Sequence, residues 1–457
     1  MVHDLMVQLP TYITAVKDAM WGLPFLCAVV TTAIAATVML NFVQFTGFFR
    51  SFREVFGGKS DGKGEINSLQ AFLKVLSTGL GNGALAGVAM AVGKGGPGAV
   101  FWIFVLGFLG MVLRFAEVFL TSMYSGDTVQ KGRALGGPFV YLKSVPGKYF
   151  LPTLYAVVCL GYGLTSGCAS QCNSIGVTIL NMTSQSSSTL LQSITPWHIA
   201  LALTSFILFT LVGGARRIAK VNGVIVPLKV GLFFAMALGV FIYHWSALPA
   251  AFALIFKCAM TPQACMGGVF GYSVQQLIAL SLNRAINASE SGLGTASIVY
   301  GATGSSSTYA NGLSAMLSSF VSVQLVCVMV GLSIVVSGVL GSGAQGVALT
   351  AAAFQTVFGS LGGWATAFLS MIFGMGVFVA YGFICRQCWF FLTNDRFEHV
   401  FTLLFCAVSF WGTVSNLDVV WDLVDIMTGA CFAINLFALL WNLPRIRAAV
   451  LVAQRKG

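Results

Sequence analysis

The sequence predicts an all-α membrane protein whose chain crosses the bilayer many times. Hydrophobic residues make up 57% of the 457 residues and charged residues only 8%, and the mean hydropathy is +0.88. A domain folded in water needs far more charge on its surface. Because each helical crossing takes roughly 20 apolar residues, spans fill the chain. We therefore expect no soluble domain and no enzymatic activity.

Apolar runs bounded by charged residues, Gly and Pro predict about eleven spans. They begin near residues 21, 70, 98, 150, 197, 222, 266, 313, 348, 397 and 419. The loops on one side are rich in Lys and Arg, whereas the loops on the other carry only Lys94 and Lys257. Since basic loops stay in the cytoplasm, we expect a bacterial inner-membrane protein with an external N-terminus and a cytoplasmic C-terminus.

The net charge of +11 does not indicate a nucleic-acid partner. The basic residues are spread over short loops and are not clustered with aromatic residues that could stack on bases. The lipid bilayer is the expected surrounding, and the short loops offer no docking domain for a soluble protein. We therefore expect a monomer.

Two glycine clusters predict interrupted helices within spans. The first, STGLGNGALAG at 77–87, is unfavourable for a continuous helix, because each Gly costs roughly 1 kcal/mol there. The second lies at 267–271, five spans later. Pairs of broken helices in corresponding positions are typical of transporters built from inverted repeats. The predicted organisation is an extra helix and cytoplasmic loop at 1–60, five-helix repeats at 66–245 and 260–445, and a basic tail at 446–457.

Such breaks predict a solute site near the middle of the membrane, because they expose backbone N–H and C=O groups. Helix N-termini favour a carboxylate, whereas freed carbonyls and helix C-termini favour an ammonium group or a cation. An amino acid matches both polarities. The alternative is that these glycines only allow helices to pack closely. Gln171, in the fourth span, could reach the solute or hydrogen-bond to another helix.

Charged residues inside spans are costly, so each should have a partner or a function. Arg114 and Glu117 are three apart and can pair on one helix face. Asp422 and Asp425 have the same spacing. These two acids could cap helix ends, relay protons, or pair with a basic residue of another span, for which the candidates are Arg284 and Arg386.

Two further charges have two interpretations each. Lys74 could extend towards the cytoplasmic interface, or it could be a buried lysine that replaces a bound cation. Glu290 could be a solvated loop acid, or it could form a gate with a cytoplasmic Arg.

Several segments resemble the family of alanine or glycine:cation symporters, the sodium:alanine symporters. The resemblance covers nearly the whole chain and is carried by GKGGPGAVFW at 93–102, LGMVLRFAEVFL, ALGGPFVYL at 134–142, VGGARRIAKVNGVIVP at 212–227, SESGLGTAS at 289–297 and VVWDLVDIMTGACFAINL at 419–436. It implies eleven spans, a leucine-transporter-type core of inverted five-helix repeats, and sodium-coupled uptake of small neutral amino acids. The substrate-binding positions that it implies are Gly81, Asn82, Gly83, Gln171, Gly267, Gly268, Phe270 and Gly271.

The sequence departs from the family pattern where the coupling ion is expected. The first break has Gly81, Asn82, Gly83 and Ala84 in place of the usual Gly, Thr, Gly and Asn. In the ninth span, Gly376 and Val377 stand where the family carries hydroxyl ligands for sodium. Neither supplies the side-chain oxygen that a hard cation prefers.

The resulting prediction is a secondary transporter that imports alanine, glycine or serine by alternating access, with no cofactor and with Na⁺ or H⁺ as the coupling ion. Lys74, Glu290 and the pair Asp422 and Asp425 are the candidate coupling or gating charges. The alternatives are a proton-coupled or uncoupled transporter, or a membrane sensor derived from a transporter.

Overall fold

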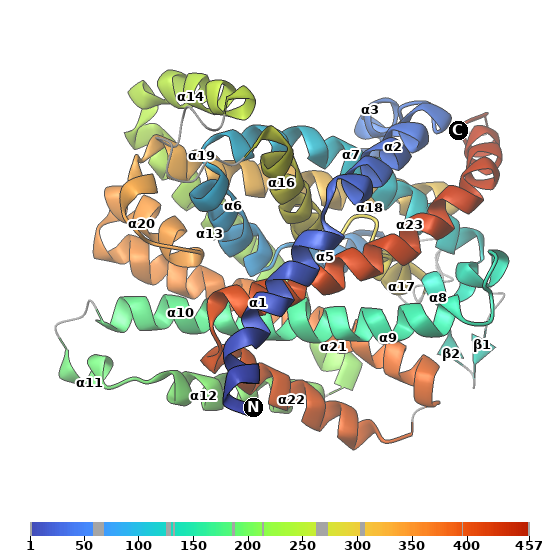
Figure 1. The fold of residues 1–457 in the computed structure, drawn as a ribbon. Helices are drawn as coiled ribbons and strands as arrows, with labels where there is room; N and C mark the ends of the chain where they lie inside the picture. The colour runs from blue at the N-terminus through green and yellow to red at the C-terminus, as the bar shows by residue number, and fades with distance from the viewer. Residues whose placement is uncertain are drawn as a thin grey trace.

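A computed structural model describes residues 2–57, 68–124, 129–130, 133–184, 188–212, 214–261, 273–301, 307–394 and 396–455. Helices dominate these residues, which confirms the predicted all-α class (Figure 1). The described strands are β1 (Val129–Gln130) and β2 (Arg133–Ala134), which pair antiparallel.

The chain begins with a bent pair of helices. α1 (Val2–Met20) and α2 (Leu23–Met39) meet at an angle of 42°. Figure 1 shows α1 crossing α23 near the N-terminal end of that helix. Two short helices follow, α3 (Val43–Thr46) and α4 (Phe48–Phe56).

The first half of the helical core contains the predicted break at Gly81. Helix α5 (Ser68–Gly79) and the π-helical turn η1 (Gly83–Gly87), continued by α6 (Val88–Gly95), are bent by 43° about 80–82. The later helices of this half are α7 (Gly98–Met123), α8 (Pro138–Tyr141), η2 (Leu142–Ser144), α9 (Leu151–Leu164), η3 (Thr165–Ala169), α10 (Ser170–Ser184), α11 (Thr189–Gln192), α12 (Pro196–Val212), α13 (Gly214–Tyr243), η4 (Trp245–Ala247) and α14 (Leu248–Met260).

The second half also contains an interrupted helix. α16 (Val274–Ser289) is followed by Glu290 as its C-cap, and α17 (Thr295–Gly301) begins five residues after Glu290. The remaining helices are α18 (Thr308–Phe320), η5 (Val321–Cys327), α19 (Val328–Val336), η6 (Val339–Gly341), α20 (Val347–Phe358), α21 (Ser360–Thr393), α22 (Glu398–Val414) and α23 (Leu417–Arg455).

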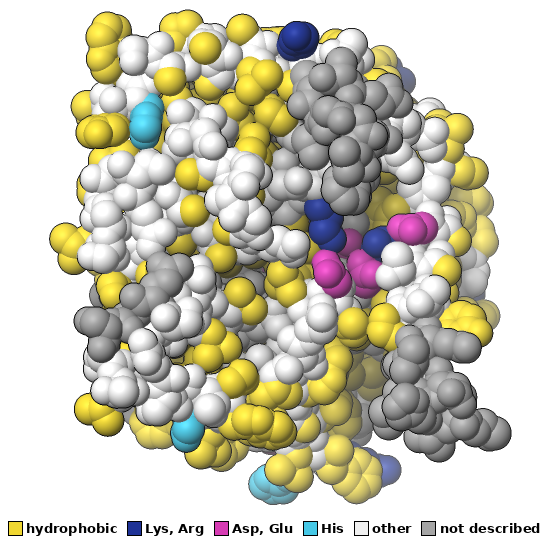
Figure 2. Space-filling view, turned by 60° about the vertical axis from the view of Figure 1, so that its left-hand side comes forward, with side chains coloured by type: hydrophobic (Ala, Val, Ile, Leu, Met, Phe, Trp, Pro, Cys, Tyr) yellow, Lys and Arg dark blue, Asp and Glu magenta, His cyan; other side chains and the backbone are white. Residues whose placement is uncertain are grey.

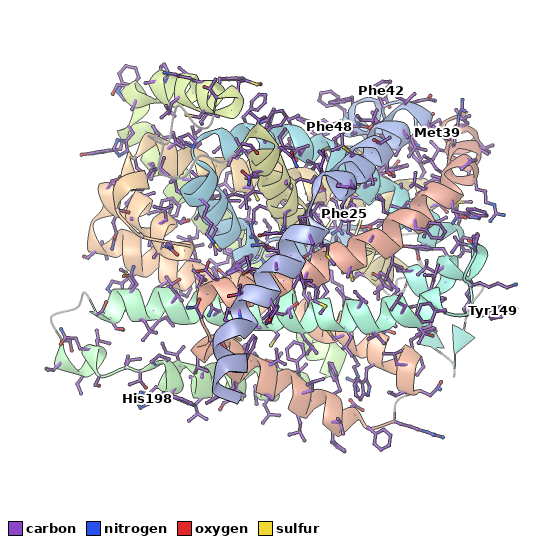
Figure 3. The ribbon with its side chains drawn as sticks, viewed as in Figure 1. Phe25, Met39, Phe42, Phe48, Tyr149 and His198 are labelled. Atoms are coloured by element: carbon purple, nitrogen blue, oxygen red, sulfur yellow. The ribbon has the colours of Figure 1, made fainter. Side chains whose placement is uncertain are left out.

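The described helices support a multi-pass membrane protein. Six are long and apolar enough to cross a bilayer, or up to eight if each bent pair is one span. Large apolar side chains lie on the outside of several helices: Leu201 is 64% exposed and Ile242 is 74% exposed. Figure 3 shows Phe42 and Tyr149 on the periphery, and Figure 2 shows hydrophobic side chains along the edges of the face that it draws. The expected count of eleven spans stays a prediction.

One span position differs from the sequence-based expectation. The ninth span does not begin near 348, because α20 ends at Phe358 and the long helix α21 begins after Gly359. Gly359 has φ +56°, a conformation that interrupts a helix and suits glycine. Residues 262–272, where the seventh span and its glycine cluster were expected, lie outside the described residues, and α16 begins at Val274.

Candidate functional site

At the first break, a lysine of another helix satisfies the backbone. The Lys229 ammonium, from α13, donates to the carbonyl oxygens of Leu80 at 2.7 Å and Ser77 at 3.4 Å. Side chains must supply such partners, because a broken helix in a membrane has no water to satisfy its freed groups. Lys229 is fully buried.

Amide side chains fix the other side of this break. The Asn82 N–H donates to Gln171 Oε1 at 2.8 Å, and Gln171 Nε2 donates to the Ser166 carbonyl at 3.0 Å. The Asn82 side chain points to α21, where its Nδ2 donates to the Ser370 carbonyl and its Oδ1 accepts from Ser370 Oγ at 2.9 Å. Gln171 therefore ties α10 to the broken helix, and Asn82 ties it to α21.

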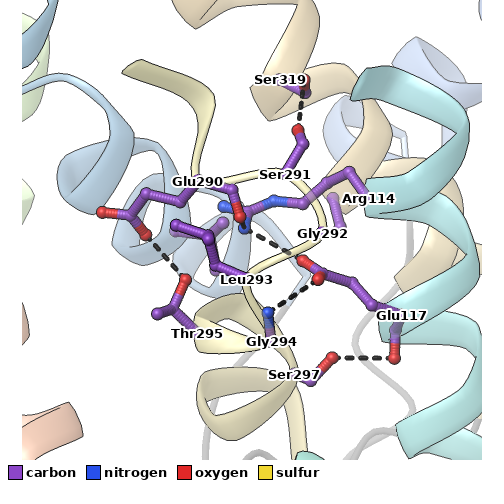
Figure 4. A network of polar contacts seen from close by, with 12 residues as sticks. Arg114, Glu117, Glu290, Ser291, Gly292, Leu293, Gly294, Thr295, Ser297 and Ser319 are labelled. Atoms are coloured by element: carbon purple, nitrogen blue, oxygen red, sulfur yellow. Dashed lines mark hydrogen bonds and ion pairs between the residues drawn. The ribbon is translucent and has the colours of Figure 1, made fainter. Parts of the chain in front are cut away.

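The second break lies at 290–294, and buried side chains hold its backbone (Figure 4). Arg114 Nη1 donates to the Glu290 carbonyl at 2.9 Å, and Glu117 Oε2 accepts from the Gly294 N–H at 2.9 Å. The carbonyls of Gly292 and Leu293 accept from Asn435 Nδ2 and from the Tyr155 hydroxyl. These partners come from α7, α23 and α9, so three helices fix this turn.

The predicted pairing of Arg114 with Glu117 is confirmed, at 3.1 Å and with both side chains buried. Glu290 is not a solvated loop acid, because it is only 2% exposed. Its carboxylate accepts from the Tyr381 hydroxyl at 2.6 Å and from Thr295 Oγ1 at 2.9 Å. Glu290 has φ +55°, which ends α16 there.

The two breaks lie against each other. A Cβ on Gly79 would come within 3.1 Å of the Ala288 carbonyl oxygen and 2.9 Å of Ser322 Oγ. A glycine is therefore needed for this close approach, as the packing interpretation of the glycine cluster expects. At Gly83 a Cβ would lie 3.7 Å from the Asn287 carbonyl, which is ordinary contact. Both interpretations of these glycines apply, since the same cluster breaks the helix and packs it.

A small cavity of about 10 Å³ lies between the breaks, and it holds no more than about one water molecule. It is lined by Thr78, Gly79, Gly81, Gly83, Ser166, Ser170, Gln171, Asn287, Glu290, Val377, Tyr381 and Trp421. The lining has carbonyls at the C-terminal ends of α5 and α16 and one carboxylate, which favour an ammonium group. Trp421 Nε1 is a buried donor without a partner in the described part of the chain, and it is free to bind an acceptor.

A larger pocket of about 680 Å³ opens beside this site, and its lining carries charges of both signs. Arg284 and Asp425 form a bidentate pair at its base, with N–O distances of 3.0 and 2.8 Å, which confirms one of the predicted pairings. Lys17 and Thr14 of α1 donate to Asp422. Figure 2 shows acidic and basic side chains gathered in a hollow of the face that it draws.

The other predicted site residues are placed as follows. Lys74 is half-buried, with its ammonium 4.1 Å from the centroid of the Phe383 ring. Val377 lines the cavity, where its Cγ2 is 2.6 Å from the position of a Cβ on Gly81. Gly376 is buried in α21 but is not part of the cavity lining. Gly267, Gly268, Phe270 and Gly271 lie outside the described residues.

Two residues of this region were not predicted from the sequence, Lys229 and Trp421. Lys229 interrupts the apolar run of the span at Ile225–Tyr243, and that charge was a usable signal. Trp421 carried no signal, because only the packing of α23 brings an indole to the cavity. Among the described residues, no group of three or more His, Cys, Asp or Glu is arranged to hold a metal ion.

The chain is similar to known transporters along nearly its whole length. Residues 6–453 match the sodium:alanine symporter family. The sodium/alanine symporter AgcS of Methanococcus maripaludis is 26% identical over 97% of this chain and 96% of its own length. The amino-acid carrier protein AlsT of Bacillus subtilis is 28% identical over 88% of this chain and 83% of its own.

An uncharacterised transporter of Haemophilus influenzae is 28% identical over 95% of this chain and 94% of its own length. A solved Na⁺-coupled sialic acid symporter in a substrate-bound, outward-open state has a TM-score of 0.46 and 11% identity, covering 94% of this chain and 84% of that chain.

Proposed function

Because the chain belongs to the sodium:alanine symporter family, we propose that it is a secondary active transporter that imports small neutral amino acids by alternating access. Alanine, glycine and serine are the proposed substrates, and a cation gradient drives their uptake. The printed names of AgcS and AlsT, a sodium/alanine symporter and an amino-acid carrier, agree with this class.

The observation that carries the proposal is the cavity between two adjoining helix breaks. Its lining offers the C-terminal end of α5 and the Glu290 carboxylate for an ammonium group, and Trp421, whose Nε1 has no partner among the described residues, for a carboxylate. The side chains of Val377, Tyr381 and Trp421 fill the space around it, which favours a small substrate. Since the cavity holds only about one water, the breaks must separate before a substrate enters.

The charged pocket is the proposed route from outside, and the pair Arg284–Asp425 between it and the cavity is the proposed outer gate. This assignment agrees with an external N-terminus and a cytoplasmic C-terminus. It also agrees with inverted repeats at 66–245 and 260–445, in which α5 and α16–α17 are the broken opening helices. The second break at 290–294 then takes the role that was expected of 267–271.

The test is uptake of labelled alanine, glycine and serine by proteoliposomes with imposed ion gradients. Accumulation of at least one of these amino acids is the expected result. Binding of an amino acid without uptake under any gradient would instead favour the sensor, and neither binding nor uptake would reject both functions.

Trp421→Phe tests the site itself. It removes the unpaired donor but keeps an aromatic ring beside Arg284, whose guanidinium is 5.0 Å from the Trp421 ring. If Nε1 binds the substrate carboxylate, affinity should fall by about tenfold, as for one charge-assisted hydrogen bond, with little change in thermal stability. Unchanged affinity would remove Trp421 from the site. Trp364→Phe, on the exposed side of α21, is the control.

A further inference from the structure

Lys229 is a positive charge in the interior of a span and at the centre of the helical core. It lies in the apolar segment Ile225–Tyr243 of α13 and is fully buried. Among the described residues, no carboxylate lies within ion-pair distance of its ammonium. A buried charge without an ionic partner is costly, and in a membrane protein it points to a function.

The partners of Lys229 are oxygens that the break of α5 releases. In a continuous helix the Leu80 carbonyl would accept from the N–H of Ala84, but that N–H donates to the Gly81 carbonyl instead. The freed Leu80 oxygen receives Lys229 Nζ at 2.7 Å, and the Ser77 oxygen receives it at 3.4 Å. These carbonyl oxygens, at the C-terminal end of a helix, are a place where a cation is favoured.

On the α21 side, an aromatic ring faces Lys229. The Phe373 ring faces the ammonium, with its centroid 5.3 Å from Nζ. The next residue, Gly374, has no side chain, and Ser370 Oγ is engaged with Asn82. A hard cation such as sodium prefers several oxygen ligands, whereas an ammonium is satisfied by two carbonyls and an aromatic face.

Few other titratable groups face Lys229. The titratable residue of α5 is Lys74, whose ammonium contacts the Phe383 ring. Phe383 and Phe373 are ten residues apart on α21, which places them about 15 Å apart along the helix. The ionisable side chains of α21 nearest to Phe373 in sequence are Tyr381 and Cys385, and Tyr381 is bonded to Glu290. α19 and α20 carry no Asp, Glu, Lys, Arg or His, and the His198 of α12 is exposed.

We propose that the Lys229 ammonium takes the place of a coupling sodium ion at the break of α5, and that reversible protonation of Lys229 couples transport to the proton gradient. This inference rests on the proposed transport function and deepens it. With the proton bound, Nζ holds the Ser77 and Leu80 carbonyls and keeps the break closed against α13. When the proton leaves, the amine loses its charge and its strong attraction to these oxygens, and α5 is released. One proton enters Nζ from one side of the membrane and leaves to the other in each cycle.

The first test uses the unaltered protein in proteoliposomes. Alanine uptake should be equal with inward gradients of sodium and of potassium, and an inward proton gradient should raise the initial rate several-fold. Uptake that requires sodium would overturn the role of Lys229 but leave the transport function standing. Absence of both uptake and amino-acid binding would instead reject the transport function on which the inference rests.

The second test uses variants and measures exchange of internal for external alanine as a function of pH. Lys229→Met should remove the pH dependence of exchange. Lys229→Arg keeps a permanent charge, so it should hold the break closed and also remove the pH dependence. Lys257→Met is the control, because it removes an exposed lysine of α14 that has no part in the breaks. A pH dependence that survives in Lys229→Met, or that is lost equally in Lys257→Met, would contradict the inference. If Lys229→Met does not fold, the ion dependence of the unaltered protein decides.

Discussion

The two helix breaks differ in how their freed backbone groups are held. At 290–294, an arginine–glutamate pair, an asparagine and a tyrosine from three helices each bind a backbone group of the turn. At the first break, Lys229 binds the carbonyls of Ser77 and Leu80, and Gln171 accepts from the Asn82 N–H. The second break is thus a fixed turn inside a network that includes a buried ion pair. The first has no ion pair and depends on one ammonium for the carbonyls at the end of α5, and we expect it to be the part that moves.

The largest expected effect is at the second break. Arg114→Met leaves Glu117 as a buried carboxylate without its ion pair and frees the Glu290 carbonyl. The free energy of unfolding should fall by about 3–5 kcal/mol, as for other broken buried pairs. Thermal unfolding in detergent, followed by tryptophan fluorescence, measures it. Arg386→Met removes an exposed partner of Glu398 and should cost less than about 1 kcal/mol. Equal losses in the two variants would show that the network does not fix this turn.

A smaller effect is expected from crowding the first break. In Gly81→Ala the new Cβ would be 2.6 Å from Val377 Cγ2 and 3.1 Å from Gln171 Oε1. Such overpacking destabilises the packed arrangement of the break by about 1–3 kcal/mol. Since about 1.4 kcal/mol corresponds to a factor of ten, alanine uptake should fall by about tenfold or more. The double variant Gly81→Ala with Val377→Ala removes the nearest clash and should recover most of the activity. Gly93→Ala is the control, because its Cβ meets only Leu349 at 3.5 Å. No recovery in the double variant would mean that crowding by Val377 is not the cause.

The smallest loss of stability is expected when a single hydroxyl is removed at either break. Ser370→Ala removes the donor to Asn82 Oδ1 at the first break, and Ser297→Ala removes the donor to the Glu117 carbonyl at the second. Each should cost about 1 kcal/mol of unfolding free energy. If the first break is the mobile one, only Ser370→Ala should also change the alanine uptake rate. A larger change in uptake for Ser297→Ala would reverse the assignment.

The sequence predicted the helical class and the first break, because glycine density acts locally on a helix. It did not predict the second break, although SESGLG stands at 289–294. Glu290, Gly292 and Gly294 all have positive φ there, yet these residues were assigned to a loop after the seventh span. The pair Arg114–Glu117 could be predicted from its spacing. The contacts of Lys229 with α5 and of Trp421 with the cavity could not, because they join residues that are distant in the chain.

Three contacts that matter for the two breaks come from one helix, α23. Asp425 holds Arg284, Trp421 forms a wall of the cavity, and Asn435 binds the Gly292 carbonyl. Trp421 and Asn435 are separated by about 21 Å along the helix axis. A helix transmits a shift along its whole length, so a solute that displaces Trp421 would also strain the Asp425 ion pair one turn further along α23 and the Asn435 bond to the second break beyond it. We therefore expect the proposed gate, the proposed binding site and the bond to the second break to respond to a solute together.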